Sequence, residues 1–264
     1  MYCIKNLLNN DDVRVLDQKE EMSVIEYTRD LSVMPHTAMT AYYCDKMNVR
    51  KKQLLINLNY SEYTISSGSM QWSVGDVSAV ADVKGVGDFL GKAIKGSVTK
   101  ESAVKPKYKG TGVLVLEPTY KHILLEDLSS WNGGIVLDDG LFLACPSTVT
   151  QKVVMRSNFS SAILGREGLF NLSLSGTGYV ALESPVPREE LVIVELKDDV
   201  LRIDGNFAIA WSKDLEFTVE KSTNSLIGSA IAKEGFVNVY RGTGKVLMAP
   251  VRNLTSASVN SISQ

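Results

Sequence analysis

Three copies of one short motif decide the fold: GTGVLVLEP at residues 110–118, GTGYVALESP at 176–185 and GTGKVLMAP at 242–250. The copies begin 66 residues apart in both intervals (176 − 110 and 242 − 176). A repeat of this length indicates three units of supersecondary structure that bury their apolar faces against one another.

Apolar residues alternate with other residues after each GTG, which is typical of a strand with one face on a core. The stretch LFNLSLS (169–175), directly before the second copy, alternates in the same way and predicts a strand there too. Two alternating strands separated by a glycine-rich tetrapeptide favour a β-hairpin, in which glycine supplies a positive φ. We therefore predict that each GTG is a hairpin turn. The alternating apolar residues after the motifs are Leu114, Leu116, Val180, Leu182, Val246 and Met248.

A second repeated pattern lies upstream of each GTG. TISSGSMQW (64–72), VLDDGLFLA (136–144) and RIDGNFAIAW (202–211) each predict a strand, a tight turn and a second strand. The turns are centred on Gly68, Gly140 and Gly205. The sequence thus predicts an all-β chain of three quasi-equivalent antiparallel repeats with pseudo-threefold symmetry and minor helical turns. We expect one domain over residues 1–264, with repeats at about 54–118, 119–185 and 186–252 and a frayed tail at 253–264.

The N-terminal extension, about 1–53, matches the repeats less well. MSVIEYTRD (22–30) and QLLINLNYSEYTI (53–65) predict strands, and MNVRKKQ (47–53) is interpreted as a solvated polar connection. Open sheet edges promote pairing with other chains unless they are covered. We therefore expect the first 60 residues to cover one edge and the chain to assemble as a homo-oligomer.

Composition excludes several classes of protein. The 264 residues are 44% hydrophobic and 22% charged, which is ordinary for a globular protein. With 28 basic and 30 acidic residues the net charge is −2, so no bulk positive field favours nucleic acid, and a nucleic-acid partner is not expected. There is neither a secretory signal nor an apolar run of membrane-spanning length, which predicts no membrane insertion. The widely spaced Cys3, Cys44 and Cys145 favour a reducing, cytoplasmic setting.

An ordered series of motifs runs along the chain: the triplicated strand units together with GLFLACPSTV (140–149) and EGLFNLSLSGTG (167–178). In this series the chain resembles a widespread bacterial family that is mostly of unknown function. Its eukaryotic relatives are named for altered inheritance of mitochondria and are described as mitochondrial biogenesis factors. The resemblance covers residues 54–252. It implies a fold like that of the tryptophan RNA-binding attenuation protein, a β-prism or short double-stranded β-helix. The family brings no established catalytic residues, so the resemblance implies none here.

Chemistry-bearing motifs are sparse. Neither His36 nor His122 lies in a recognisable nucleophile motif, and no spacing of His, Cys, Asp or Glu is typical of a metal site. KGVGDFLGKAIKG (84–96) has the spacing GxGxxxG, lacks GK[ST] and precedes no long helix, so we reject it as a phosphate loop. The sequence predicts no catalytic residues, no cofactor, no cofactor-binding residues and no metal ligands, and it leaves ligand-binding residues unassigned.

Two sets of repeated residues invite a functional reading. Glu101, Glu167 and Glu234 lie 9, 9 and 8 residues before their GTG motifs. They either converge on an internal axis or fix their connectors by accepting backbone N–H bonds, and we favour the second. For Trp72 and Trp211, at related positions after Gly68 and Gly205, we predict packing against the sheet.

Because no acid, base, nucleophile or metal constellation emerges, we expect a non-enzymatic scaffold or interaction protein, with a protein partner of unknown identity. The alternative is a binding module for a small molecule or RNA, by analogy of fold alone. An enzyme is the third reading, and it would require a deep pocket holding His36 or His122 beside a carboxylate.

Overall fold

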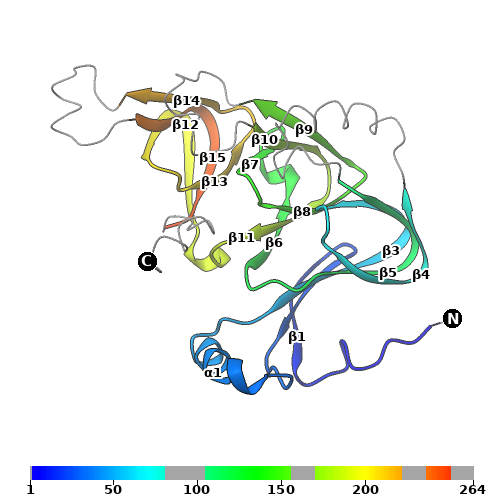
Figure 1. Ribbon diagram of the computed structural model, residues 1–264. Coiled ribbons are helices and arrows are strands. Elements are labelled where there is room, and N and C mark those ends of the chain that lie inside the picture. The colour runs from blue at the N-terminus through cyan, green and yellow to red at the C-terminus, as the bar shows by residue number, and fades with distance from the viewer. Residues whose placement is uncertain (1, 81–104, 156–169, 222–235, 251–264) are drawn as a thin grey trace, which may run out of the picture.

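A computed structural model describes residues 2–80, 105–155, 170–221 and 236–250 (Figure 1). Strands dominate these residues, and they form two curled sheets in which every strand pairing is antiparallel. The described helices are short: α1 (Ala38–Lys46) and the 3-10 turns η1 (Pro35–Thr37), η3 (Leu128–Ser130) and η4 (Arg188–Glu190). The predicted all-β class with minor helical turns is confirmed.

The first sheet has eight strands, in the order β1-β2-β3-β8-β11-β6, while β5 pairs with both β3 and β4. The order places β1 and β6 at the two ends of the path. Its strands are β1 (Val13–Lys19), β2 (Met22–Tyr27), β3 (Lys52–Ile65), β4 (Met70–Val80), β5 (Lys107–Leu116), β6 (His122–Asp127), β8 (Phe142–Pro146) and β11 (Tyr179–Ser184).

The second sheet has seven strands, in the order β12-β15-β13-β7-β10-β9, with β14 also paired to β15. Along this order β12 and β9 are the end strands, while β14 pairs with β15 alone among the described strands. Its strands are β7 (Ile135–Leu137), β9 (Val149–Met155), β10 (Phe170–Gly176), β12 (Val192–Asp204), β13 (Ala208–Ser212), β14 (Glu216–Lys221) and β15 (Phe236–Met248).

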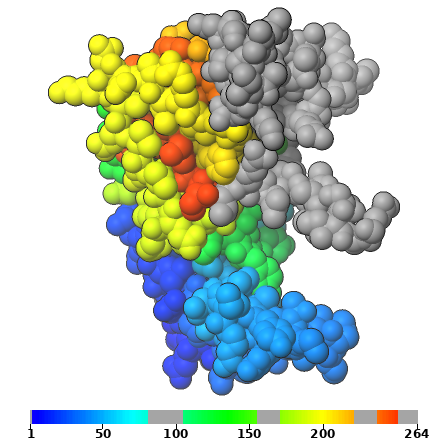
Figure 2. All heavy atoms as spheres, turned by 90° about the vertical axis from the view of Figure 1, so that its left-hand side faces the viewer, coloured from blue at the N-terminus to red at the C-terminus, as the bar shows by residue number. Residues whose placement is uncertain are grey.

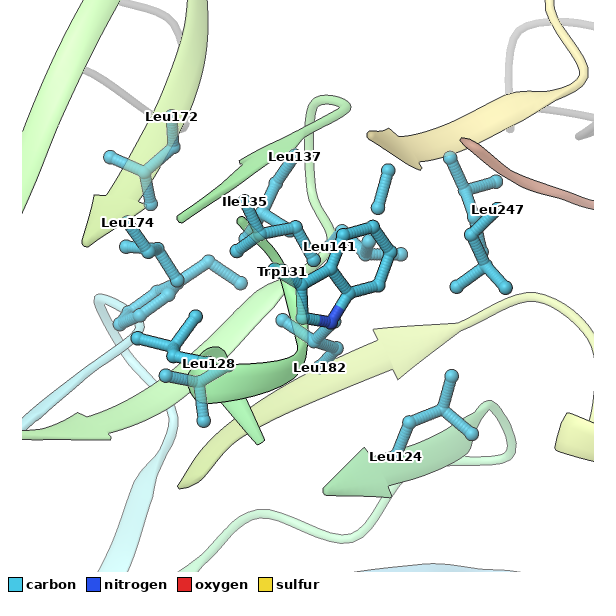
Figure 3. Packing of buried hydrophobic residues seen from close by; sticks show 14 of the residues in the cluster. Leu124, Leu128, Trp131, Ile135, Leu137, Leu141, Leu172, Leu174, Leu182 and Leu247 are labelled. Carbon is cyan, nitrogen blue, oxygen red and sulfur yellow. The ribbon is translucent and has the colours of Figure 1, made fainter. Parts of the chain in front are cut away.

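The largest core cluster joins the two sheets (Figure 3). Leucines of β6 and β11 meet the apolar side chains of β7, β10 and β15 around the buried indole of Trp131. Close-packed apolar surface removed from water is the main stabilising contribution in such an arrangement. Labelled members in the figure include Leu124, Leu128, Leu137, Leu174, Leu182 and Leu247.

The prediction that each GTG is a hairpin turn is wrong. The first and third copies lie inside the continuous strands β5 and β15. The second copy lies between β10 and β11, which belong to different sheets and do not pair with each other. The motif therefore continues a strand, and in the second copy it carries the chain from one sheet to the other.

Close approach of a neighbouring backbone explains these glycines. An ideal Cβ placed on Gly110, whose φ is +134°, would lie 1.9 Å from the carbonyl oxygen of Asp76 on β4. At Gly176 the same construction would bring the Cβ to 2.2 Å from the carbonyl oxygen of Thr148. Glycine inside a strand often marks a bend or the close passage of another backbone. The strands predicted from the alternating pattern are confirmed, but the positive φ of these glycines allows close packing between strands.

The threonine of the motif faces a bulge in the adjacent strand. In β3 the register shifts between Asn59 and Ser61, and the backbone N–H of Tyr60 donates to Thr111 Oγ1 at 3.3 Å. In β12 the register shifts in the same way, and the N–H of Asp198 donates to Thr243 Oγ1 at 3.0 Å. Both bulge residues have positive φ, so the threonine hydroxyl satisfies an N–H that the bulge removes from the ladder.

The N-terminal extension joins the first sheet. Residues Met22–Glu26 of β2 pair with Lys52–Ile56 of β3, which confirms that the extension covers a sheet edge. Ile4 and Leu7 pack against the cluster around Ile25, on the same part of the sheet.

The prediction of a solvated connection at 47–53 is wrong for its last two residues. Lys52 and Gln53 are buried at the start of β3. Lys52 Nζ lies 3.5 Å from the buried carboxylate of Glu26. Gln53 Nε2 donates to the carbonyl oxygen of Leu116 at 2.6 Å, and Tyr27 donates its hydroxyl to Gln53 Oε1. Polar residues are tolerated inside a fold when each polar atom finds a partner.

Tight turns centred on glycine are confirmed at Gly68, Gly140 and Gly205, all of which have positive φ. Glu101, Glu167, Glu234 and the loop at 84–96 lie outside the described residues. The pseudo-threefold prism, the single domain with its repeat boundaries and the frayed tail stay predictions.

Candidate functional site: a cleft between the two sheets

A cleft of about 430 Å³ opens where the end strands of the two sheets face each other. Strands β1 and β6 of the first sheet contribute one wall, and β12 and β15 of the second sheet contribute the other. We call it the inter-sheet cleft; its lining residues are Asp17, Lys19, Leu125, Glu126, Asp127, Ser130, Trp131, Tyr179, Arg188, Ile193, Lys245 and Leu247.

The buried indole of Trp131, with the Lys245 ammonium over its ring, lines the cleft. Trp131 is 2% exposed and donates its Nε1–H to Glu126 Oε2 at 3.2 Å. The ammonium of Lys245 lies 4.3 Å from the centre of the indole ring and donates to Ser130 Oγ at 3.0 Å. The ring face attracts this cation, so the lysine head is held in place at the cleft.

A second cation is fixed beside it. The Arg188 guanidinium donates to Glu126 Oε1 and, at 3.4 Å, to the carbonyl oxygen of Leu125. The Glu126 side chain is 9% exposed, whereas that of Arg188 is 46% exposed. The carboxylate is therefore buried and paired, while the guanidinium extends to solvent with further N–H donors.

Local sequence positions the indole. Asp127 ends β6 and accepts a hydrogen bond from the backbone N–H of Ser129 at 2.9 Å, which caps the turn η3. Ser130 Oγ donates to the carbonyl oxygen of Asp127 at 2.8 Å and tightens the same turn. Aspartate and serine favour such local bonds to the backbone. The turn places Trp131 five residues after its partner Glu126, on the inner side of β6.

A smaller cavity of about 230 Å³ adjoins the cleft and shares Ser130 and Lys245 with it. Thr243 and Gly244 of the third GTG motif line it, together with Glu195 of β12. The two cavities follow β12 from Ile193 to Leu196. An extended groove therefore runs beside this end strand.

Strand β12 pairs with β15 along one edge, and no strand of the described residues pairs with its other edge. At its start Val192 is 44% exposed and Ile193 is 54% exposed. Farther along, the bulge and the charged side chains of Lys197, Asp198 and Asp199 protect the edge in the manner of natural end strands. The unprotected part is the part beside the cleft.

The histidines and cysteines of the chain lie outside the inter-sheet cleft. Of the described residues, no group of three or more His, Cys, Asp or Glu is placed to hold a metal ion. His36 is exposed in η1, His122 is half-buried at the start of β6, and neither lines the inter-sheet cleft. Burial, together with the nearby Lys52 charge, lowers the pKa of His122. Burial raises the pKa of the Cys145 thiol to about 12, so it is protonated at neutral pH.

Sequence reasoning placed the tryptophans but not the cleft. Trp131 and Trp211 are buried and Trp72 is half-buried against the sheet, which confirms sheet packing for Trp72 and Trp211. It did not single out Glu126, Arg188 or Lys245. One feature of the sequence could have indicated the cleft: the residue after each GTG is valine in the first copy but Tyr179 and Lys245 in the others. Both of these residues line the cleft.

Comparison with known proteins gives a family and a fold. The family model described as mitochondrial biogenesis AIM24 matches residues 47–251. A crystal structure of a protein from Streptococcus pyogenes is similar with a TM-score of 0.58 and 21% sequence identity, over 82% of this chain and 95% of that one. No curated protein matches the chain. In the part of the chain that the structure describes, no helix is long and apolar enough to span a membrane.

Proposed function

The chain belongs to the mitochondrial biogenesis AIM24 family, and from that premise we propose that it is a non-enzymatic interaction protein. Its inter-sheet cleft receives a short extended segment of a partner protein. The observation that carries the proposal is the edge of β12 that pairs with no strand of the described residues, whose exposed Val192 and Ile193 adjoin a cleft with fixed cations.

Strand addition explains why these features occur together. An extended peptide gains affinity from main-chain hydrogen bonds to a free sheet edge, and it gains specificity from pockets that receive alternate side chains. The edge beginning at Val192 supplies the main-chain groups. The inter-sheet cleft and its smaller neighbour supply two successive pockets along the same strand.

The lining indicates which segment fits. Ile193, which is 54% exposed and packs beside the buried Leu247 of β15, offers an apolar surface. Lys245 and the exposed end of Arg188 offer positive charge at the adjoining positions. We therefore propose a segment in which an apolar side chain and a carboxylate point into the groove, because each would meet a complementary group.

Selection from a random peptide library on the immobilised full chain tests the proposal. We expect enriched peptides to carry apolar and acidic residues in alternation. Their binding should fall at least tenfold in Ile193→Lys, which puts a charge on the edge, and in Lys245→Glu, which replaces a positive charge of the lining with a negative one.

A matched control is Val153→Lys, which adds the same charge at a half-exposed valine on the other end strand of the same sheet, β9. It should leave peptide binding unchanged. The proposal would be overturned if the enriched peptides bound the Ile193→Lys and Lys245→Glu variants as tightly as they bind the wild type.

A second candidate is a binding module for a small molecule, which the cleft volume of about 430 Å³ favours because it lies in the usual range for ligand pockets. Native mass spectrometry of the freshly purified protein tests it. A constant excess mass that disappears in Lys245→Glu would support a retained ligand. A mass equal to whole chains would argue against one.

A further inference from the structure

The N-terminal extension carries an arm, residues 31–49, that leaves its apolar side chains in solvent. It contains η1 and α1, and none of the nine residues of α1 is buried. Figure 2 shows this part of the chain as a light-blue lobe that projects from the body of the molecule. Its exposed large apolar side chains are Leu31, Met34, Met39, Tyr42, Tyr43, Met47 and Val49.

Ion pairs fix the residues at the two ends of the arm, although its apolar side chains are exposed to solvent. Arg50 pairs with Asp45 at 3.0 Å and Lys51 pairs with Asp30 at 2.6 Å. The N–H of Val49 donates to the carbonyl oxygen of Cys44 at 2.8 Å at the end of the helix. The Lys51–Asp30 pair joins the two ends of the arm, and the other two contacts fix the end of the helix to the residues that follow it.

Such a helix is unstable by itself. Helices shorter than about 12 residues are marginal in water, and in proteins an apolar face packed against a neighbour supplies most of their stability. Met39, Tyr43 and Met47 are spaced four residues apart and form one stripe, with Tyr42 beside it. All four side chains are more than half exposed, and the ring contacts of Tyr42 are with Tyr43 and Lys46 of the same helix, so no other segment of the described residues covers this stripe.

Most of the arm also lies outside the family region. The family match begins at residue 47, so α1 precedes it. The shared fold therefore does not require this helix, and its exposed stripe belongs to the part of the chain that comes before that fold.

We propose that the arm is a dimerisation surface, on which the α1 helices of two copies of this chain pack against each other. The seven apolar side chains together expose on the order of 800 Å², so an interface that covered all of them would reach the area that each partner buries in a standard stable interface. Methionine and tyrosine are enriched at such interfaces.

Charge favours a second copy as the occupant. Asp45 and Lys46 are the only acidic and basic residues between 31 and 49, apart from His36, so the arm carries no net charge to repel its copy. A two-fold interface needs a self-complementary surface, and a neutral apolar stripe meets that condition. A helix that binds a lipid surface is typically rich in lysine and arginine on its polar face, whereas α1 has one lysine.

Sedimentation velocity of the full chain over a hundredfold range of concentration tests the proposal. We expect a species of two chains, each of 28.9 kDa, to predominate at the upper end. The double variant Met39→Glu, Tyr43→Glu should sediment as one chain throughout. Tyr60→Glu is the matched control, because Tyr60 is 91% exposed on β3, away from the arm, and it should dimerise like the wild type.

Hydrogen exchange of the wild type gives a second, independent readout. Amides of residues 38–46 should exchange at least tenfold more slowly at the concentration where dimers predominate. A single-chain wild type at every concentration would overturn the proposal. So would a dimer that the arm variant leaves intact, or an arm that is protected only by vesicles of phosphatidylcholine and phosphatidylserine. The proposal does not depend on the inter-sheet cleft.

Discussion

Trp131 Nε1 donates to Glu126 Oε2 at 3.2 Å, and the Arg188 guanidinium donates to the other oxygen of the same carboxylate, Oε1. One buried carboxylate thus ties the indole of the inter-sheet core to a half-exposed cation at the cleft. The geometry of the proposed binding surface depends on Glu126, because it holds the nearby Trp131 and also Arg188, which lies 62 residues away in the sequence.

Glu126→Ala should therefore destabilise the protein by about 2 kcal/mol, as it leaves a buried indole N–H and a guanidinium without their acceptor. The half-exposed guanidinium regains water, which keeps the loss below that of a fully buried pair. Urea denaturation monitored by tryptophan fluorescence measures the change.

Glu183→Ala is the control for that experiment. Glu183 pairs with Lys121 at 2.9 Å in the same sheet, but half of the lysine side chain is exposed. Its loss should cost less than about 1 kcal/mol, as is usual for surface pairs. Equal losses in the two variants would show that Glu126 contributes no more than a surface charge.

The close passage of β4 over β5 predicts a large difference between two glycines. Gly110→Ala should cost about 3 kcal/mol or more, because the added Cβ would overlap the carbonyl oxygen of Asp76 and φ is positive. Gly68→Ala meets no atom within 4 Å and has only its positive φ to overcome, which costs about 1 kcal/mol. Thermal unfolding of both variants decides this; a Gly110→Ala variant as stable as Gly68→Ala would contradict the observed packing.

Much of the fold could be predicted from alternation and turn chemistry. The strand segments and the turns at Gly68, Gly140 and Gly205 follow from local preferences that the tertiary structure does not override. The GTG motifs could not be placed, because positive φ suits both a hairpin turn and the close approach of another strand. Only the partner strand, distant in sequence, distinguishes the two.

The candidate site was less predictable for the same reason. Glu126, Arg188 and Lys245 come from three segments that are far apart in sequence, and each reads alone as an ordinary surface charge. Lys52 reads as part of a solvated basic run, yet its burial depends on Glu26 across the neighbouring strand. Pairing between strands, which a single sequence does not specify, decides both cases.

The Cys145 thiol should resist modification in the folded protein. Burial raises its pKa to about 12, and the thiolate is the reactive form. Titration with a thiol reagent at pH 8 should label Cys3 and Cys44 but leave Cys145 unmodified until denaturant is added, because Cys145 is buried and Cys3 is exposed. Rapid labelling of three thiols per folded wild-type chain, falling to two in Cys145→Ala, would be inconsistent with this burial.

Stability should fall as the solution is acidified through the range in which histidine titrates. Burial, with the Lys52 charge, lowers the pKa of His122 in the folded protein, so the unfolded chain binds the proton more readily. The loss should begin near the ordinary histidine pKa of about 6.5 and end below the lowered one. Urea midpoints at pH 7.5 and 5.5 measure it. His122→Gln should reduce this difference, whereas His36→Gln, which removes the other histidine, should retain it.

The most direct test of the proposed function is amide hydrogen exchange of the full chain, with and without the tightest peptide selected from the library. Strand addition predicts slower exchange at residues 192–196 of β12, and loss of that protection in Ile193→Lys. Protection confined to other strands, or none at β12 while the peptide is bound, would contradict the account.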